Sequence, residues 1–174
     1  MGLDRVVLMP AREAPHKMID QDPGAEERYL MCELVASGAE WLDASRIEVD
    51  RPGPSYTADT LRQLAAERPG DEIVLVLGGD RAVSLPQWHE PAEVVRLATL
   101  AVARRNGVGE GQVREALAGL ADGDRVRFFD MPAIEVSSSA IRDRIAEGLP
   151  FEFLLPERVA HRIAEAGLYR GVAG

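Results

Sequence analysis

A run of three serines is the segment whose residue types most directly suggest chemistry. Ser137, Ser138 and Ser139 follow an apolar stretch and precede a helical pattern that contains Arg142. A serine at a helix N-cap leaves backbone N–H groups at the positive end of the helix, and phosphate binds to such groups. Arg142, one turn further on, can bind the same anion through its planar guanidinium. The run is also explained by an ordinary helix cap followed by a solvated arginine, so both interpretations stay open.

A second candidate follows the most apolar strand pattern in the chain, residues 73–77. Gly78, Gly79 and Asp80 come directly after it. Adjacent glycines allow a ligand to approach the backbone, and an aspartate there can accept a hydrogen bond from a ribose hydroxyl. Asp80 is equally well explained as the cap of the next helix.

Trp88 and His89 lie in a loop after that strand. A tryptophan in a loop can stack on a planar heteroaromatic ring, and it can equally fill the edge of the core. His89 has no carboxylate nearby in the sequence that clearly orients it, which argues against a role as general base.

Two further segments carry binding groups. Tyr56 and Thr57 place an aromatic ring and a hydroxyl at the start of a predicted helix, which suits a planar ring that bears a carboxylate. A turn followed by an N-cap at Thr57 explains them as well. Lys17, beside His16 in the loop after the first strand, offers a cation to phosphate or lies in a solvated loop.

The elements that must position these residues alternate between strand and helix patterns. The pattern predicts strands at 6–9, 46–49, 73–77, 98–103 and 126–129, and helices at 26–37, 57–65, 93–97, 111–120, 141–147 and 157–166. Such alternation predicts an α/β fold with a largely parallel sheet, in which strand 73–77 is central and buried on both faces. Ligands of these folds bind outside the carboxyl ends of the strands, where the candidate segments lie.

Composition limits the class of protein. The chain has 174 residues, 46% of them hydrophobic, which predicts one domain spanning 1–174. A net charge of −9 argues against nucleic acid and anionic membranes as partners. The single cysteine, Cys32, and the lack of a signal-like or membrane-spanning apolar run predict a cytoplasmic protein without disulfides. The oligomeric state is left open, a homo-oligomer included.

In their order along the chain, these motifs resemble bacterial nicotinate mononucleotide adenylyltransferases of the nucleotidyltransferase superfamily. The resemblance extends from about Leu3 to Tyr169. The serine run with Arg142 and the Gly-Gly-Asp segment are shared in outline with related enzymes such as pantetheine-phosphate adenylyltransferase. The Ser-Tyr-Thr segment and the Trp-His pair are more particular to the nicotinate enzymes, so the expected substrate rests on them.

The resemblance implies a Rossmann-like, doubly wound fold and an adenylyl transfer in NAD biosynthesis. ATP and nicotinate mononucleotide give nicotinate adenine dinucleotide and pyrophosphate, with Mg²⁺ bound through the ATP phosphates and no metal ligand from the protein. By this resemblance, the catalytic residues are Arg142 and Ser138; the ATP-binding residues are Gly79, Asp80, Ser138, Ser139 and Arg142; and the mononucleotide-binding residues are Tyr56, Thr57, Trp88, His89 and Lys17.

The sequence departs from the family at its start. The N-terminal strand and the His-x-Gly-His element that follows it in the family are not found, so we expect a sheet without its first, central strand and a reading frame that continues upstream of Met1. Two alternatives stay open. One is a catalytically poor or inactive nucleotide-binding paralogue or fragment, and the other is an adenylyltransferase for nicotinamide mononucleotide or phosphopantetheine.

Overall fold

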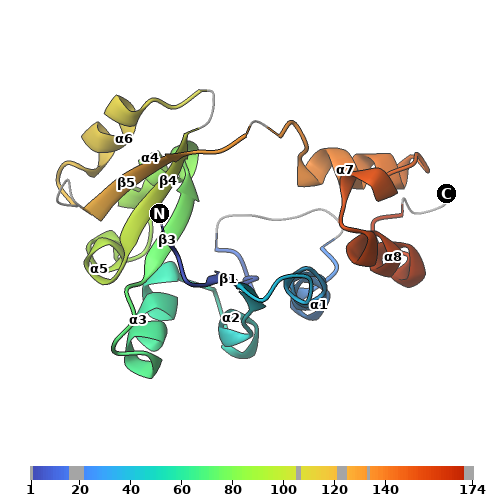
Figure 1. Cartoon of the computed structure of the whole chain (residues 1–174), viewed down its shortest axis with the longest axis horizontal. Coiled ribbons are helices and arrows are strands. Elements are labelled where there is room, and N and C mark those ends of the chain that lie inside the picture. The colour runs from blue at the N-terminus through green and yellow to red at the C-terminus, as the bar shows by residue number, and fades with distance from the viewer. Residues whose placement is uncertain (1, 16–21, 105–106, 121–124, 133, 171–174) are drawn as a thin grey trace. The chain divides into compact units, whose positions relative to one another are not determined.

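The computed structural model describes residues 2–15, 22–104, 107–120, 125–132 and 134–170. The chain divides into two compact units. The central unit is Tyr56–Ala133, and the terminal unit combines Gly2–Ser55 with Ile134–Gly174. Figure 1 labels most of the helices and strands of the two units, which are described separately below.

The central unit is an α/β layer built on three strands. Their order is β3-β4-β5, and both pairings are parallel. Along the chain the elements are α3 (Thr57–Glu67), β3 (Val74–Gly78), α4 (Gly79–Ser84), the 3₁₀ turn η1 (Leu85–Gln87), α5 (Pro91–Leu97), β4 (Thr99–Arg104), α6 (Glu110–Leu117) and β5 (Val126–Asp130). Parallel strands joined through helices confirm the α/β prediction.

One face of this sheet forms the main core. Leu77, Leu100, Val102 and Val126 pack there with buried residues of α3, α4, α5 and α6. Leu85, in η1, is fully buried in the same cluster. The helices therefore hold the segments that follow β3 against a rigid sheet.

The prediction that strand 73–77 is buried on both faces is wrong. Val76 is 50% exposed, whereas Leu100, Ala101 and Val102 of β4 are buried. The physical reason is strand order: within the described residues β3 pairs only with β4, and β4 lies between two partners. The continuous apolar run belongs to an outer strand of this three-stranded sheet, and β4 is the central one.

The terminal unit contains a two-stranded parallel sheet and a helical cluster. The strands are β1 (Val6–Leu8) and β2 (Leu42–Ala44), and the helical elements are α1 (Ala25–Ala36), α2 (Ile47–Asp50), α7 (Ser138–Ala146), η3 (Glu152–Leu154) and α8 (Glu157–Ala166). Apolar residues of α1, α7, η3 and α8 share one core cluster, which includes Ile141, Phe151 and Ile163. No helix in the described part of the chain is both long and apolar enough to cross a membrane.

The predicted strand at 46–49 is also wrong, because the chain forms the short helix α2 there and the strand lies earlier, at β2. Arg46 precedes α2 and binds both Glu26 of α1 and Asp50 one turn further on. Val49 is the buried residue of this turn. An i,i+4 ion pair and one inward apolar residue fit a helical turn, and tertiary contacts override the strand propensity of the segment.

Candidate functional site

The serine run forms the start of α7 in the terminal unit, as predicted. Ser137 is the N-cap: its backbone is extended, and its Oγ accepts a hydrogen bond from the Ala140 amide at 3.1 Å. Ser138 and Ser139 occupy the first turn and are exposed to solvent. Because the first amides of a helix have no partner within the helix, this turn presents exposed hydroxyls beside a positive helix end.

Arg142 lies on the same turn as the serines. Its Nη2 atom donates to Ser139 Oγ at 3.1 Å, and its side chain is half-buried. The fork is therefore directed towards the helix start, where a bound anion can take up its remaining N–H donors. The structure brings together Ser138, Ser139 and Arg142 as the sequence predicted.

The segment after β3 begins α4 directly. Gly78 is the N-cap of this helix and Asp80 lies in its first turn, so the cap predicted at Asp80 falls two residues earlier. Gly79 is buried, and a Cβ atom there would lie 3.0 Å from Val108 Cβ. Close packing against Val108 thus explains the glycine without any ligand. Asp80 is exposed at the carboxyl end of β3, the position expected for a ligand contact in this kind of sheet.

Tyr56 and His89, predicted from separate motifs, lie against each other in the central unit. Their ring centroids are 4.3 Å apart, and the rings are tilted by 36°. Tyr56 is the N-cap residue of α3 and Thr57 is its first helical residue, so the N-cap predicted at Thr57 is one residue too late. Two aromatic rings and a hydroxyl therefore share one region of this unit.

Trp88 follows η1 and is half-buried. Its Nε1 donates to Ser84 Oγ at 3.2 Å, and its ring packs against the main core. The Trp88 ring therefore contributes to the packing of the core, and only its accessible portion can contact a ligand. Lys17 falls outside the described residues.

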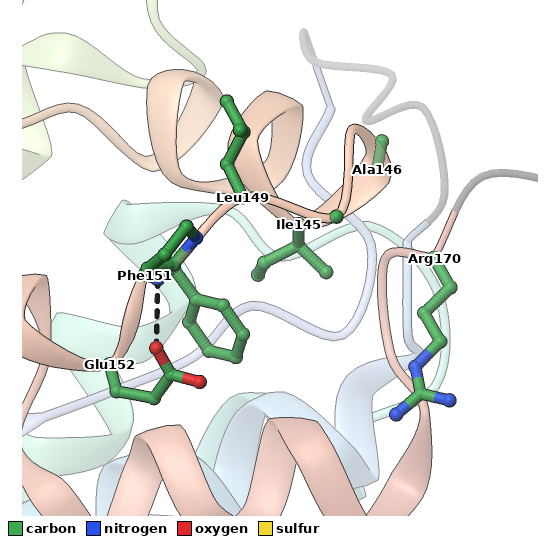
Figure 2. Close-up of a pocket in the computed structure, with 8 residues that line it drawn as sticks. Ile145, Ala146, Leu149, Phe151, Glu152 and Arg170 are labelled. Carbon is green, nitrogen blue, oxygen red and sulfur yellow. Dashed lines mark hydrogen bonds between the residues drawn. The ribbon is translucent and has the colours of Figure 1, made fainter.

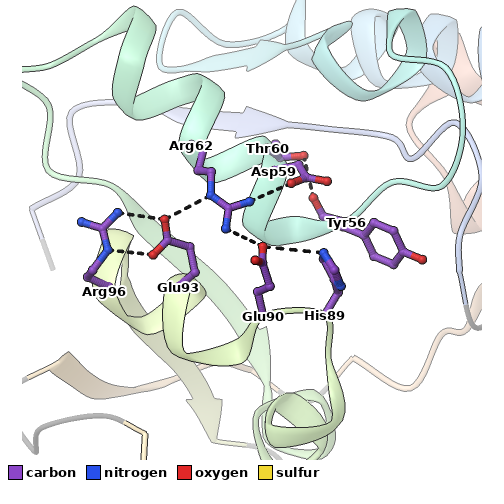
Figure 3. Close-up of polar contacts among 8 residues, drawn as sticks. All are labelled: Tyr56, Asp59, Thr60, Arg62, His89, Glu90, Glu93 and Arg96. Atoms are coloured by element: carbon purple, nitrogen blue, oxygen red, sulfur yellow. Dashed lines mark hydrogen bonds and ion pairs between the residues drawn. The ribbon is translucent and has the colours of Figure 1, made fainter.

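Sequence reasoning missed the charged residues around His89. Glu90 Oε2 lies 3.6 Å from His89 Nε2, so a neighbouring carboxylate does face this imidazole. Arg62 of α3 binds Asp59, Glu90 and Glu93 (Figure 3). The Arg96 guanidinium, together with Arg62, lowers the pKa of the Glu93 carboxyl to about 2. The signal was available in part, because Asp59 and Arg62 are three residues apart on one helix face and Glu90 adjoins His89.

A pocket of about 640 Å³ lies elsewhere, in the terminal unit (Figure 2). Its lining comes from the end of α7, the segment 148–152 and Arg170. The Phe151 amide donates to Glu152 Oε2 at 3.0 Å on its wall. None of the described residues that the sequence singled out lines this pocket, so it is separate from the candidate site.

Comparison with known proteins places the chain in a family. The sequence model of the cytidylyltransferase-like family matches residues 1–144. The chain is 38% identical over 173 residues to the probable nicotinate-nucleotide adenylyltransferase of Thermomicrobium roseum, covering 99% of this chain and 80% of that protein. It belongs to the nicotinate-nucleotide adenylyltransferase family. The expected family is thereby confirmed, within the cytidylyltransferase-like group.

A second relative supports the same placement, and a solved structure shows the shared fold. The probable nicotinate-nucleotide adenylyltransferase of Frankia casuarinae is 38% identical over 172 residues, covering 98% of this chain and 87% of that protein. The structure of Plasmodium falciparum nicotinic acid mononucleotide adenylyltransferase complexed with NaAD superposes with a TM-score of 0.74 at 13% identity. That likeness covers 95% of this chain and 82% of the other, and it shows that the two proteins share the Rossmann-like fold.

Proposed function

We propose that this member of the nicotinate-nucleotide adenylyltransferase family transfers the adenylyl group of ATP to nicotinate mononucleotide. The products are nicotinate adenine dinucleotide and pyrophosphate, and the step belongs to NAD biosynthesis. The observation that carries the substrate assignment is the pairing of Tyr56 with His89, because it joins the two motifs on which that assignment rests. The 38% identity to a relative of that name over 99% of this chain supports the reaction.

In this reaction the phosphate of the mononucleotide attacks the α-phosphorus of ATP, and pyrophosphate leaves from the opposite side. The protein forms no covalent bond to either substrate, so its contribution is positioning and the stabilisation of negative charge. We assign Ser138, Ser139 and Arg142 to the ATP phosphates, with Arg142 and Ser138 acting on the charge that develops in the transition state. The exposed first turn of α7 supports this role.

The mononucleotide is assigned to the central unit. Trp88 stacks on the pyridine ring, while Tyr56, Thr57 and the backbone beside His89 receive the pyridine carboxylate. Aromatic stacking of this kind contributes about 1–3 kcal/mol per base in nucleic-acid complexes. Lys17 is assigned to phosphate on sequence grounds alone. Asp80 and the Gly79 backbone are assigned to the nucleotide, a role that the exposure of Asp80 supports.

Mg²⁺ enters this proposal through the ATP phosphates. Among the described residues, one group could offer a cation three ligand atoms within 4.8 Å of one another: Asp59, His89 and Glu90. The Arg62 guanidinium already binds both carboxylates of that group, and Mg²⁺ prefers an all-oxygen shell. The group therefore fits a magnesium ion poorly, and no protein ligand is assigned to the metal.

We treat residues 1–174 as a single nucleotidyltransferase domain that works in the cytoplasm. The family match over residues 1–144 supports the first part, because it spans segments of both units. The chain contains a single cysteine and so cannot form an internal disulfide, which is consistent with a place in the cytoplasm.

The test is pyrophosphate release from ATP and Mg²⁺ with three acceptors in turn: nicotinate mononucleotide, nicotinamide mononucleotide and phosphopantetheine. We expect the highest kcat/KM with nicotinate mononucleotide. A preference for phosphopantetheine contradicts the roles given to Tyr56, Thr57 and Trp88. Absence of turnover with all three acceptors, in a chain shown to be folded by circular dichroism, contradicts the proposed reaction; ATP binding by that chain would then identify an inactive nucleotide-binding protein.

A further inference from the structure

Arg62 uses all three of its nitrogen atoms to bind carboxylates from two elements. Nη1 donates to Asp59 Oδ1 at 2.9 Å on its own helix, α3. Nε donates to Glu93 Oε1 at 3.1 Å on α5, and Nη2 donates to Glu90 Oε2 in the turn before α5. Figure 3 shows the three carboxylates converging on this one guanidinium. Arg62 therefore ties the start of α5 to α3.

The turn at Glu90, which Arg62 binds, has a left-handed backbone conformation. Glu90 has φ 48° and ψ 58°, the left-handed region, and it is the N-cap residue of α5. A residue with a Cβ atom is disfavoured in this region, and glycine adopts it freely. A conformation of this kind persists where the surroundings impose it. The ion pair between Arg62 and the Glu90 carboxylate is such a constraint.

The residue placed by this turn is His89. Glu90 directly follows it, and the Glu90 carboxylate lies 3.6 Å from His89 Nε2. On its other side the His89 ring meets Tyr56, whose position is set by the start of α3. Arg62 lies on α3, so the helix that begins directly after Tyr56 also carries the guanidinium that anchors the turn after His89. One helix thus fixes both partners of the aromatic pair.

A metal ion at Asp59, His89 and Glu90 would compete with Arg62 for the same carboxylates. Such an ion would have to displace Arg62 from two of them. The guanidinium already supplies the positive charge that these acids need.

We infer that Arg62 and Glu90 are positioning residues for the mononucleotide: their ion pair holds the left-handed turn at Glu90 and so places His89 beside Tyr56. This inference rests on the proposed function, because it concerns the residues assigned to the pyridine carboxylate. Neither Arg62 nor Glu90 needs to touch the substrate. Their loss is expected to act on mononucleotide binding, through His89 and its backbone.

The test compares two substitutions of Glu90 that differ in what they remove. Glu90→Ala removes the carboxylate and keeps the Cβ atom, so the left-handed turn loses its anchor. Glu90→Gly also removes the carboxylate, but glycine tolerates the turn without one. We expect Glu90→Ala to raise KM for nicotinate mononucleotide about tenfold, with KM for ATP and kcat changed less than about threefold. Glu90→Gly is expected to restore KM to within about threefold of the original.

Two arginine variants complete the set. Arg62→Met removes the guanidinium of the Arg62–Glu90 ion pair. It is expected to raise KM for nicotinate mononucleotide as much as Glu90→Ala does. Arg96→Met is the matched control, since the Arg96 side chain binds Glu93 and contacts neither Glu90 nor His89 in the described structure. It is expected to leave all three kinetic constants unchanged. Equal impairment by Glu90→Ala and Glu90→Gly, or a loss confined to kcat, overturns the inference.

A second readout needs no substrate. The Tyr56 ring, whose centroid lies 4.3 Å from that of His89, is expected to shift the NMR resonances of the His89 ring protons. These resonances can be assigned among the three histidines by their loss in His89→Asn. The shift is expected to vanish in Arg62→Met and Glu90→Ala and to persist in Glu90→Gly and Arg96→Met. A shift that persists in all four variants overturns the inference whether or not the chain is active. Lack of turnover by the unmodified chain, with the expected shifts intact, counts against the proposed function alone.

Discussion

Arg142 and Ser139 are joined by a 3.1 Å hydrogen bond across one turn of α7, and the arginine fork is thereby held at the start of the helix. The start of α7 therefore has two sources of positive charge, the Arg142 guanidinium and the positive end of the helix dipole. A phosphate there would accept hydrogen bonds from groups that are already aligned.

Replacing Arg142 with methionine is expected to lower kcat/KM for ATP by about one to two orders of magnitude, the range for a lost hydrogen bond to a charged group. Arg144→Met is the matched control on the same helix. Its guanidinium binds the Pro150 carbonyl and has no proposed role in the site. Steady-state kinetics of both variants, at varied ATP, measure the difference. Equal losses in the two variants would point to a general effect on α7.

The serines at the same helix start separate capping from ligand binding. Ser137→Ala removes the N-cap hydrogen bond to Ala140 and is expected to lower the free energy of unfolding by about 1 kcal/mol. Ser138→Ala removes an exposed hydroxyl that we assign to the transition state, so it is expected to lower kcat with little change in stability. Urea denaturation measures the first effect and kinetics the second. A stability loss in Ser138→Ala as large as that in Ser137→Ala would argue that both serines are structural.

Trp88 is expected to stack on the pyridine ring. Trp88→Ala is therefore expected to weaken nicotinate mononucleotide binding by about 1–3 kcal/mol, with ATP binding little changed. Trp88→Phe, which keeps an aromatic face, is expected to retain most of the affinity. Isothermal titration calorimetry with each ligand measures this. Equal losses for the two ligands would instead indicate that the packing of Trp88 against the core is its main role.

The pairing of the Glu93 carboxyl with two arginines leads us to expect that the free energy of unfolding depends on pH in the acid range. Its pKa is lowered from 4.5 to about 2, first by the hydrogen bond from Arg96 and then by that from Arg62. A group with a depressed pKa in the folded state stabilises the fold above its unfolded pKa, and this contribution is lost as pH falls through the folded value. We expect the stability difference between the unmodified chain and Glu93→Gln to be constant above about pH 5 and to shrink between pH 4.5 and 2. Urea denaturation of both chains at pH 6, 4 and 3 measures this difference in unfolding free energy. A difference that stays the same at all three pH values would show that Glu93 is not paired in solution.

The position of each strand in the central sheet sets the cost of shortening its side chains. Leu100 in β4 is fully buried, whereas Val76 in β3 is half exposed. Leu100→Ala is expected to cost about 2–5 kcal/mol of stability, and Val76→Ala well under that. Chemical denaturation of the two variants measures the contrast. Similar losses would mean that a further segment covers β3 in solution.

Local patterns were sufficient for part of this protein. The Ser137 cap and the direction of Arg142 follow from residues within one helix, so capping rules and helical spacing predict them. The parallel α/β architecture likewise follows from the alternation of elements. The segment at 46–49 misled because its residues suit either state, and the contacts of Arg46 with α1 decide in favour of helix.

Other features depend on contacts between distant segments. The Tyr56–His89 contact and the Arg62–Glu90 ion pair exist because α3 lies against the start of α5. Spacing rules that apply within one element cannot predict such a contact. A glycine is needed at position 79 because Val108, which follows the next strand in the sequence, packs closely against it. Burial of β4 in place of β3 depends on strand order, which a run of apolar residues does not encode.

The terminal unit is assembled from both ends of the chain, and this affects the order in which the protein can fold. Arg162 of α8 binds Glu27 of α1, with a 3.0 Å hydrogen bond across 135 residues of sequence. During synthesis, the apolar face of α1 that contains Met31 and Leu34 must wait for α7 and α8 to leave the ribosome. The central unit is one uninterrupted segment and can form its sheet in the meantime. The apolar face of α1 therefore stays without its core partners while the central unit folds, and it is covered only once α7 and α8 have been made.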